Sequence, residues 1–350
     1  MDGIAQLTRE ERAELFTETA ARMGVRPIIA EKDFWVCWTL KYLFALPAEQ
    51  PGLIFKGGTS LSKVYGLIRR FSEDIDLAFD RRDLGFGGDR DPETAPSGKA
   101  RQRRLKELGE ECGRHIAVTL VPTLQKEFGS TIGMHGWQLA VDEEKPLAVH
   151  FAYPKSLETA EYDALRYLRP VVTMELGARS DHWPAEWHPV TPYVADKFPD
   201  LFTRPSCNVK ALAAQRAFWE KALLLHAQFH QRPGKPVPER QSRHYFDMAM
   251  LAQSDIKDGA LAQHELLARV AVHSKLFFGL KKGPYEEAIA GKLRLLPHED
   301  LEKVLRRDYA AMQEMIFRDP PSFDELLAQL KTLEGEINAS ERRAEAELRN

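Results

Sequence analysis

Cysteine is scarce in this sequence, and the features of a secreted or membrane-spanning chain are missing. The three cysteines, Cys37, Cys112 and Cys207, are far apart and form no CxxC motif. This argues against a disulfide framework or a structural zinc site and fits a reducing compartment. The N-terminal stretch is acidic and helical in pattern, unlike a signal peptide, and no apolar run approaches the ~20 residues that span a bilayer. We therefore expect a cytoplasmic protein without a membrane partner.

A strong excess of charge of one sign is also absent. The formal net charge is -3 at pH 7, so any site for nucleic acid must be local. The chain also lacks the GxSxG, HExxH and Walker A motifs, which excludes the enzyme classes that depend on them. What is present is 43% hydrophobic residues in a chain of 350, enough for one large domain or two ordinary ones.

Hydrophobic periodicity separates an α/β part from a helical part. Helices are predicted at 9–23, where Thr8 and Glu11 form a capping box, and at 28–46, 59–66 and 100–128. Strands are predicted at 53–55, 73–79, 147–153 and 171–177. Residues 83–99, rich in Gly, Asp and Pro, are predicted to form a mobile surface loop.

The chain changes character in residues 181–205, which are rich in Pro, Trp and His and contain the predicted domain boundary. Beyond them, helices are predicted at 209–230, 242–253, 259–278, 298–317 and 323–346. We therefore predict an α+β fold, with a mixed sheet flanked by helices over residues 1–200 and a helical bundle over residues 201–350.

Two acidic residues in one predicted strand form the first candidate site. Asp74 and Asp76 are two residues apart, so their side chains lie on the same face of a strand. Two neighbouring carboxylates repel each other unless a cation lies between them. Mg²⁺ prefers such hard oxygen ligands and keeps positions open for phosphate oxygens, so the pair is a candidate metal site.

A glycine turn precedes this strand and closes the strand before it. Gly57, Gly58, Thr59 and Ser60 stand at a predicted strand-to-helix turn. Glycine allows the backbone to approach a phosphate closely, and a helix N-terminus offers N–H donors. The alternative is a plain tight turn with a capping residue. Together with the acidic strand, the turn predicts a phosphate cradle followed by a metal-binding strand.

These segments carry a family resemblance. The motifs KGGTSL at residues 56–61 and RFSEDIDL at 70–77 resemble the first motif of the AbiEii/AbiGii toxins, nucleotidyltransferases of the polymerase-β type. Residues 29–36, IAEKDFWV, resemble the family's E-K-D helix. Residues 216–221, RAFWEK, resemble its lysine helix, and 243–248, RHYFDM, resemble its R-x-x-x-D helix. The four segments occur in the expected order within residues 28–255.

The resemblance implies roles for these residues. Asp74 and Asp76 would hold one or two Mg²⁺ ions, with Glu175 as third carboxylate, or else as an outward strand residue. Lys221 would bind the developing pyrophosphate. Asp247 would be the last acidic residue of the site, with a salt bridge to Lys221 or Arg243 as the structural alternative. Further candidates for phosphate binding are Lys32, Lys56, Gly57, Gly58, Thr59, Ser60, Arg70 and Ser72, although Arg70 alternatively braces the strand carboxylates.

The resemblance also implies a function. It indicates the Mg²⁺-dependent nucleotidyltransferase toxin of an AbiE-like, type IV toxin–antitoxin system, associated with phage defence. The enzyme would transfer a nucleotidyl group from an NTP to an acceptor, with release of pyrophosphate, in a cleft between the two halves. Its partner would be a DNA-binding antitoxin encoded nearby, which need not form a stable complex with it.

The acceptor stays open at this stage. An RNA or tRNA 3′ end is favoured slightly by the basic run at residues 99–106, although such runs are usually solvated helix faces. A protein side chain or a small molecule such as an aminoglycoside is the first alternative. A non-catalytic NTP-binding regulatory module is the second. Nothing in the sequence selects the nucleotide.

Overall fold

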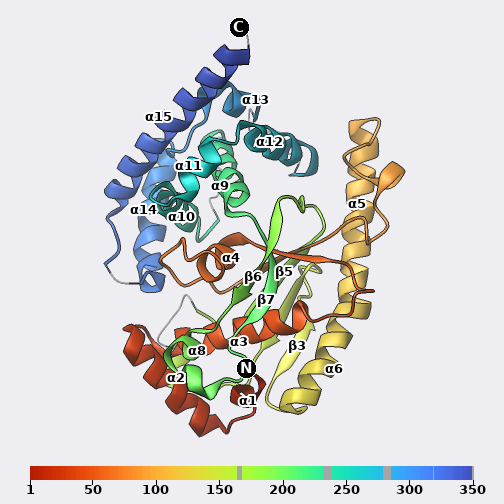
Figure 1. Ribbon diagram of the computed structural model, residues 1–350, viewed down its shortest axis with the longest axis vertical. Helices are drawn as coiled ribbons and strands as arrows, with labels where there is room; N and C mark the ends of the chain where they lie inside the picture. Colours follow the sequence, from red (N-terminus) through yellow and green to blue (C-terminus); the bar gives the residue numbers. More distant parts are fainter. Residues whose placement is uncertain (164–167, 232–237, 279–284, 318, 349–350) are drawn as a thin grey trace. The chain divides into compact units, whose positions relative to one another are not determined.

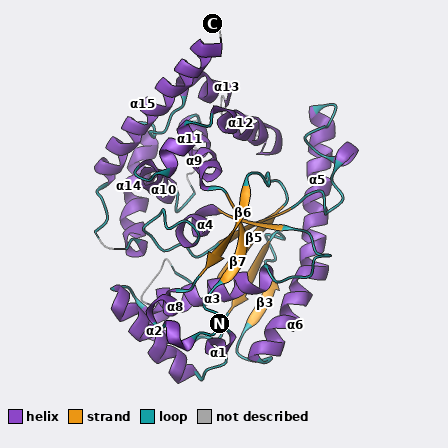
Figure 2. Cartoon of the chain, viewed as in Figure 1, coloured by secondary structure: helices purple, strands orange, loops and turns teal. Residues whose placement is uncertain are grey.

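The chain folds into two compact units that are not continuous in sequence. The computed structural model describes residues 1–163, 168–231, 238–278, 285–317 and 319–348 (Figure 1). Unit 1 comprises Met1–Val64 and Phe71–Leu212, and unit 2 comprises Tyr65–Arg70 and the chain from Ala213 onward. Figure 2 shows that the strands belong to the first unit, while helices build the second. The predicted α+β fold is therefore confirmed.

Unit 1 is built on a mixed sheet of seven strands among the described residues, in the order β3-β4-β5-β2-β1-β7-β6. The pairs β1–β7 and β2–β5 are parallel, and the other neighbours are antiparallel. The strands are β1 (Leu53–Lys56), β2 (Ile75–Phe79), β3 (Gln138–Val141), β4 (Ala148–Ala152), β5 (Val172–Gly177), β6 (Ala185–Val190) and β7 (Cys207–Leu212).

Helices surround this sheet. They are α1 (Asp2–Ala5), α2 (Arg9–Met23), α3 (Pro27–Leu43), α4 (Gly57–Lys63), α5 (Gly98–His115), α6 (Val121–Ile132), α7 (Thr159–Asp163) and α8 (Tyr193–Lys197). Shorter turns are η1 (Gly88–Arg90), η2 (Ile116–Leu120) and η3 (Pro199–Leu201). The capping box predicted at the start of α2 is present, because the Thr8 side chain accepts from the Glu11 N–H and the Glu11 side chain accepts from the Thr8 N–H.

Aromatic side chains fix helix α3 against one face of the sheet. Trp35 and Trp38 are fully buried, and both contact Phe151 of β4, at ring-centroid distances of 5.8 and 5.9 Å. Phe128 of α6 joins them, 4.6 Å from Trp38 and 4.9 Å from Phe151. The strand register carries this covered face across the sheet to Ile75 of β2. Side chains of opposite parity in β2 and β5 therefore lie on the other face.

The predicted helix start at Val209 was wrong, because residues 207–212 form strand β7. This strand lies inside the sheet between β1 and β6, and its residues Val209, Ala211 and Leu212 are buried. A short apolar run next to a helix does not reveal by periodicity where the strand ends. The expected boundary between residues 200 and 201 precedes β7, which belongs to unit 1. Strands β3 and β6 were not predicted.

Unit 2 is a helical assembly. Its elements are α9 (Ala214–Phe229), α10 (Ser242–Ala252), α11 (Ile256–Leu261), α12 (His264–Phe278), α13 (Tyr285–Glu287), η4 (Ala288–Lys292), α14 (Glu299–Met312), η5 (Gln313–Met315) and α15 (Phe323–Leu348). Fully buried Phe218, Trp219, Leu305, Leu326 and Leu330 contribute to its core. None of the described helices combines the length and the apolar character needed to cross a membrane.

Candidate active site

The strand carboxylates lie in one row across the sheet of unit 1. Asp76 of β2 is the register partner of Glu175 in β5 on one side and of Lys56 in β1 on the other. Register partners point to the same face of a sheet, so two carboxylates and one ammonium lie side by side. This face is opposite to the one that α3 covers, and Glu175 is exposed on it. We call Lys56, Asp76 and Glu175 the carboxylate row.

Asp74 stands just before β2 and continues this arrangement. Burial alternates along the segment, with Glu73 and Ile75 buried and Asp74 and Asp76 half-buried. The alternation is that of an extended chain, so Asp74 lies on the same side as Asp76. The structure thus brings Asp74, Asp76 and Glu175 to one face of the sheet, the placement that joint metal binding requires.

Gly57 fits directly under the carboxylate of Asp76. A Cβ atom at residue 57 would lie 1.8 Å from Oδ2 and 2.6 Å from Cγ of Asp76, far inside van der Waals contact. The backbone of Gly57 also has φ +78°, a left-handed conformation that favours glycine. The first glycine of the turn is therefore required both by backbone conformation and by the position of Asp76.

The remaining turn residues divide into two groups. Thr59 and Ser60 are buried, and the Thr59 hydroxyl donates to the Asp74 carbonyl at 2.5 Å and lies 3.0 Å from Ser72 Oγ. Thr59 and Ser72 thus brace the chain just before β2. The N-cap residue of α4, Lys56, makes no side-chain capping hydrogen bond, and the helix begins with Gly57 and Gly58. The backbone of these glycines is the part of the turn that remains suited to a phosphate.

Lys32 does not join the carboxylate row. Its side chain is 2% exposed, forms an ion pair with Glu73 and donates to the Arg169 carbonyl at 2.7 Å. Glu73 has the opposite parity to Asp74 and Asp76, so this ion pair lies on the α3 side of the sheet. The structure therefore separates Lys32 from the other candidate phosphate ligands of unit 1.

A second cluster of candidates lies in unit 2, around Asp247 of α10. The Asp247 carboxylate is fully buried and accepts two hydrogen bonds from Arg70, from Nε at 2.7 Å and from Nη2 at 2.9 Å. Lys221 of α9 donates to Oδ2 at 2.8 Å. The ion pair with Lys221, which was the structural alternative for Asp247, is therefore present, and the Arg70 guanidinium holds the same carboxylate from another direction.

Electrostatics keeps this cluster charged. Burial opposes ionisation of Asp247, but the charges of Arg70 and Lys221 and their hydrogen bonds outweigh it and hold its pKa below the ordinary value. The neighbouring His244 is the converse case, because burial and then the charges of Lys221 and Arg243 hold its pKa well below the usual range. The cluster therefore combines two cations, one anion and a neutral imidazole.

A divalent cation is compatible with the acidic residues of unit 1. Among the described residues, no group of three or more His, Cys, Asp or Glu side chains is gathered as a ready metal cage. Mg²⁺ commonly binds through one or two carboxylates and completes its shell with water and substrate phosphates. The hard oxygen donors of Asp76 and Glu175, with Asp74 next to them and Gly57 leaving room at Asp76, fit such a half-built site.

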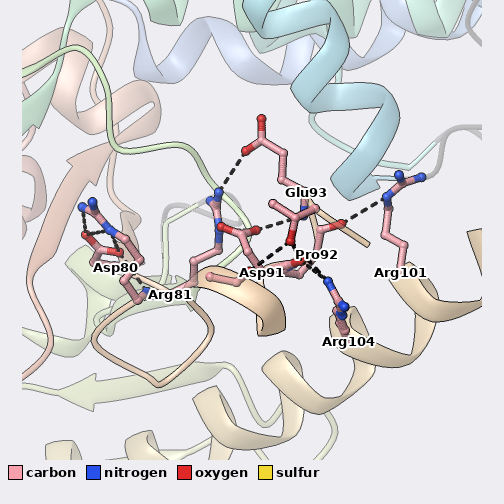
Figure 3. Close-up of polar contacts among 10 residues, drawn as sticks. Asp80, Arg81, Asp91, Pro92, Glu93, Arg101 and Arg104 are labelled. Carbon is pink, nitrogen blue, oxygen red and sulfur yellow. Dashed lines mark hydrogen bonds and ion pairs between the residues drawn. The ribbon is translucent and has the colours of Figure 1, made fainter. Parts of the chain in front are cut away.

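The basic run at the start of α5 is partly used inside the protein. Figure 3 shows Arg101 and Arg104 pointing toward the loop that precedes the helix. Arg101 donates to the Pro92 carbonyl at 3.2 Å and Arg104 to the Asp91 carbonyl at 2.6 Å, while Arg81 donates to the Asp91 carboxylate at 3.1 Å. The predicted surface loop is therefore held by arginine hydrogen bonds and an ion pair, a feature that its Gly- and Pro-rich composition did not reveal.

The other cations of this run lie on the solvent side. Arg103 and Lys106 have 74% and 78% exposed side chains and form loose pairs with Glu107 and Glu110 one turn later. Lys99 is also exposed. Exposed pairs of this kind contribute little energy, so these cations stay available to an anionic partner.

A family model and solved structures of other proteins are similar to this chain. The family model described as "Nucleotidyl transferase AbiEii toxin, Type IV TA system" matches residues 38–329. Among solved structures, the chain is similar to MenT4, a nucleotidyltransferase toxin from Mycobacterium tuberculosis H37Rv, at 16% identity and a TM-score of 0.51, over 96% of this chain and 92% of that one. JHP933 from Helicobacter pylori matches at 12% identity and a TM-score of 0.42, over 90% and 96%. A search of curated proteins gives no match.

Proposed function

The chain belongs to the AbiEii family of nucleotidyltransferase toxins of type IV toxin–antitoxin systems, and from this we propose that it transfers a nucleotidyl group from an NTP to the 3′ end of an RNA, with tRNA as the acceptor. The reaction would depend on Mg²⁺. In it the acceptor hydroxyl oxygen forms a bond to the α-phosphorus, and the bond from that phosphorus to pyrophosphate breaks. Such chemistry depends on positioning and charge stabilisation rather than on a protein nucleophile.

The carboxylate row is the observation that carries this proposal. Asp76 and Glu175, with Asp74, would hold Mg²⁺, which when bound neutralises the charge of the triphosphate. Lys56 next to Asp76 adds a cation on the same face of the sheet. The backbone of Gly57 and Gly58 offers N–H donors to phosphate oxygens. Each group needed at the reacting phosphate thus has a candidate in this part of unit 1.

We assign Lys221 to the pyrophosphate leaving group. Its side chain is 12% exposed and its ammonium is held by Asp247, which cannot move freely because Arg70 binds it from another direction. A lysine fixed in this way loses little conformational entropy when it binds a phosphate. Asp247 accordingly acts as a positioning residue, and the low pKa of its carboxyl keeps the pair charged over the physiological range.

RNA is the acceptor that the surface charges favour. The exposed cations Lys99, Arg103 and Lys106 follow one another along the start of α5, where they would meet a phosphate backbone. A DNA-binding antitoxin encoded nearby, a cytoplasmic location and a role in phage defence belong to the same proposal. Transfer to a protein side chain or a small molecule, and a non-catalytic NTP-binding role, are the outcomes against which it is tested.

The test is expression in bacteria followed by sequencing of RNA 3′ ends. We expect the wild-type chain to slow growth and to add nucleotides to tRNA, and Asp76→Asn to lower the rate of addition at least ~100-fold because it removes a ligand charge at the reacting phosphate. Glu186→Gln is the matched control, since it removes an exposed strand carboxylate of the same sheet outside the row.

Three results would contradict the proposal. If Asp76→Asn were as toxic as the wild-type chain, the assignment of Asp76 as a Mg²⁺ ligand would be refuted. If label from radioactive NTPs appeared only on protein or on small molecules, RNA would be refuted as the acceptor and the labelled molecule would take its place. Absence of Mg²⁺-dependent binding of all four NTPs in calorimetry would favour the non-catalytic alternative.

A further inference from the structure

Three consecutive charged residues of helix α3 are buried in unit 1. Glu31, Lys32 and Asp33 are 0%, 2% and 1% exposed, although such residues are almost never fully buried unless they are paired. Successive residues of an α-helix point about 100° apart, so the three side chains leave the helix in different directions. Each one therefore needs a partner of its own in a different segment of the chain.

Lys32 reaches the entry of strand β2. Its ammonium forms an ion pair with Glu73, whose side chain is 7% exposed, and donates to the Arg169 carbonyl. Glu73 directly precedes Asp74. On the other side of the same segment, the Thr59 hydroxyl holds the Asp74 carbonyl. The backbone that presents Asp74 and Asp76 is thus anchored by Glu73 on one face and by Thr59 at the next residue.

Asp33 reaches the end of helix α4. Its carboxylate pairs with Lys63 at 2.7 Å and accepts from the Tyr193 N–H at 2.6 Å. The Lys63 ammonium also lies 3.7 Å from the centre of the Tyr193 ring, in a cation–π contact. Lys63 is the last residue of α4, and Gly57 is the first. The ion pair therefore fixes the short helix whose opening residue lies under Asp76.

Among the described residues, Glu31 makes no such connection. Its two oxygens accept from the Ser156 N–H at 2.7 Å and from the Tyr162 hydroxyl at 2.8 Å, in a segment that contributes nothing to the carboxylate row. It is as buried as its neighbours and as costly to leave unpaired. Glu31 thus provides a control that is matched in helix, charge and burial.

From these contacts we infer that Lys32 and Asp33 are positioning residues for the carboxylate row. Lys32 sets the place of Asp74 and Asp76 through Glu73, and Asp33 sets the place of Gly57 through Lys63. Lys32 then acts on the protein and not on the substrate, contrary to the phosphate-binding role that the sequence suggested. This inference rests on the proposed function, in which the row binds Mg²⁺ and the triphosphate.

A double-mutant cycle on Lys32 and Glu73 tests the inference. Lys32→Met or Glu73→Leu removes one member of the buried ion pair and leaves the other, whereas the double variant removes both charges. We expect each single variant to lower the melting temperature, weaken Mg²⁺ binding and reduce kcat by up to ~100-fold, with kcat within ~10-fold of wild type in the double variant. Glu31→Gln should lower the melting temperature and leave Mg²⁺ binding, KM for NTP and kcat of the folded enzyme unchanged.

Two outcomes would overturn the inference. If Lys32 is a phosphate ligand, Lys32→Met raises KM for NTP and the double variant recovers nothing. If the ion pair serves stability alone, the single variants melt earlier but retain the wild-type kcat and Mg²⁺ affinity, as Glu31→Gln does. A wild-type protein without transferase activity would count against the proposed function, and calorimetric Mg²⁺ binding across the cycle would still decide the positioning role.

Discussion

Replacement of Gly57 by alanine is the sharpest perturbation that the candidate site offers. It adds one methyl group and changes no charge. That methyl carbon would lie 1.8 Å from Oδ2 of Asp76 and 2.9 Å from its Cβ, so the carboxylate and not merely the tip of a flexible chain is in the way. The substitution therefore moves a proposed metal ligand without removing it.

Two separate effects determine the size of the response. Alanine in the left-handed conformation at φ +78° costs about 1–2 kcal/mol of stability. Relief of the overlap requires Asp76 or the turn to withdraw by more than ~1 Å, and misplacement on this scale costs ~100-fold in rate. We expect Gly57→Ala to lower kcat by at least that factor, with a modest loss in the free energy of unfolding.

Gly24→Ala separates the two effects. Gly24 ends helix α2 with φ +68°, and a Cβ there meets nothing within 4 Å. Alanine at residue 24 would therefore have the same left-handed backbone strain as alanine at residue 57, without the steric overlap with Asp76. Urea denaturation should give similar losses for both variants, about 1–2 kcal/mol, while the nucleotidyl-transfer assay at saturating Mg²⁺ and NTP should find a slow enzyme only for Gly57→Ala. A Gly57→Ala enzyme that is strained yet as fast as Gly24→Ala would refute the assignment of Asp76.

Two further predictions concern how buried ionisable groups affect the stability of the fold. Asp247→Asn removes the buried carboxylate charge that Arg70 and Lys221 both contact, so urea denaturation should give a loss of about 3–5 kcal/mol. An unchanged unfolding free energy would contradict the ionic account of the cluster. Burial lowers the pKa of His182 and His244, so the unfolded chain takes up protons first as the pH falls below about 6.5. The melting temperature should therefore fall from pH 7 to pH 5, less steeply when both are replaced by glutamine, and a flat profile would show that neither histidine is buried in its neutral form.

Local features of the fold were predictable from the sequence. The capping box around Thr8, the strand at residues 53–55 and the acidic strand all depend on residues close to one another in the chain, and the structure contains each of them. Strand β7 was not predicted because its burial between β1 and β6 depends on pairing with distant strands. Strand β6 was not predicted because it is an exposed edge strand that contains Pro189, and buried and exposed residues hardly alternate along it.

The candidate site shows the same division. The spacing of Asp74 and Asp76 places them on one face without any knowledge of the fold. That Glu175 is the register partner of Asp76, or that Arg70 binds Asp247, depends on pairings across 99 and 177 positions of the chain. The roles of these residues in catalysis stay predictions until the variants are measured.

The two units cannot be obtained by cutting the chain once. A fragment that stops at residue 200 lacks β7, so β1 and β6 lose the strand between them and expose unpaired edges that invite aggregation. A fragment that starts at residue 213 lacks Arg70, which leaves the buried Asp247 with Lys221 as its remaining partner among the contacts described above. Limited proteolysis or split expression at this boundary should therefore give unstable pieces rather than two working domains, and a gene truncated there would give a harmless product.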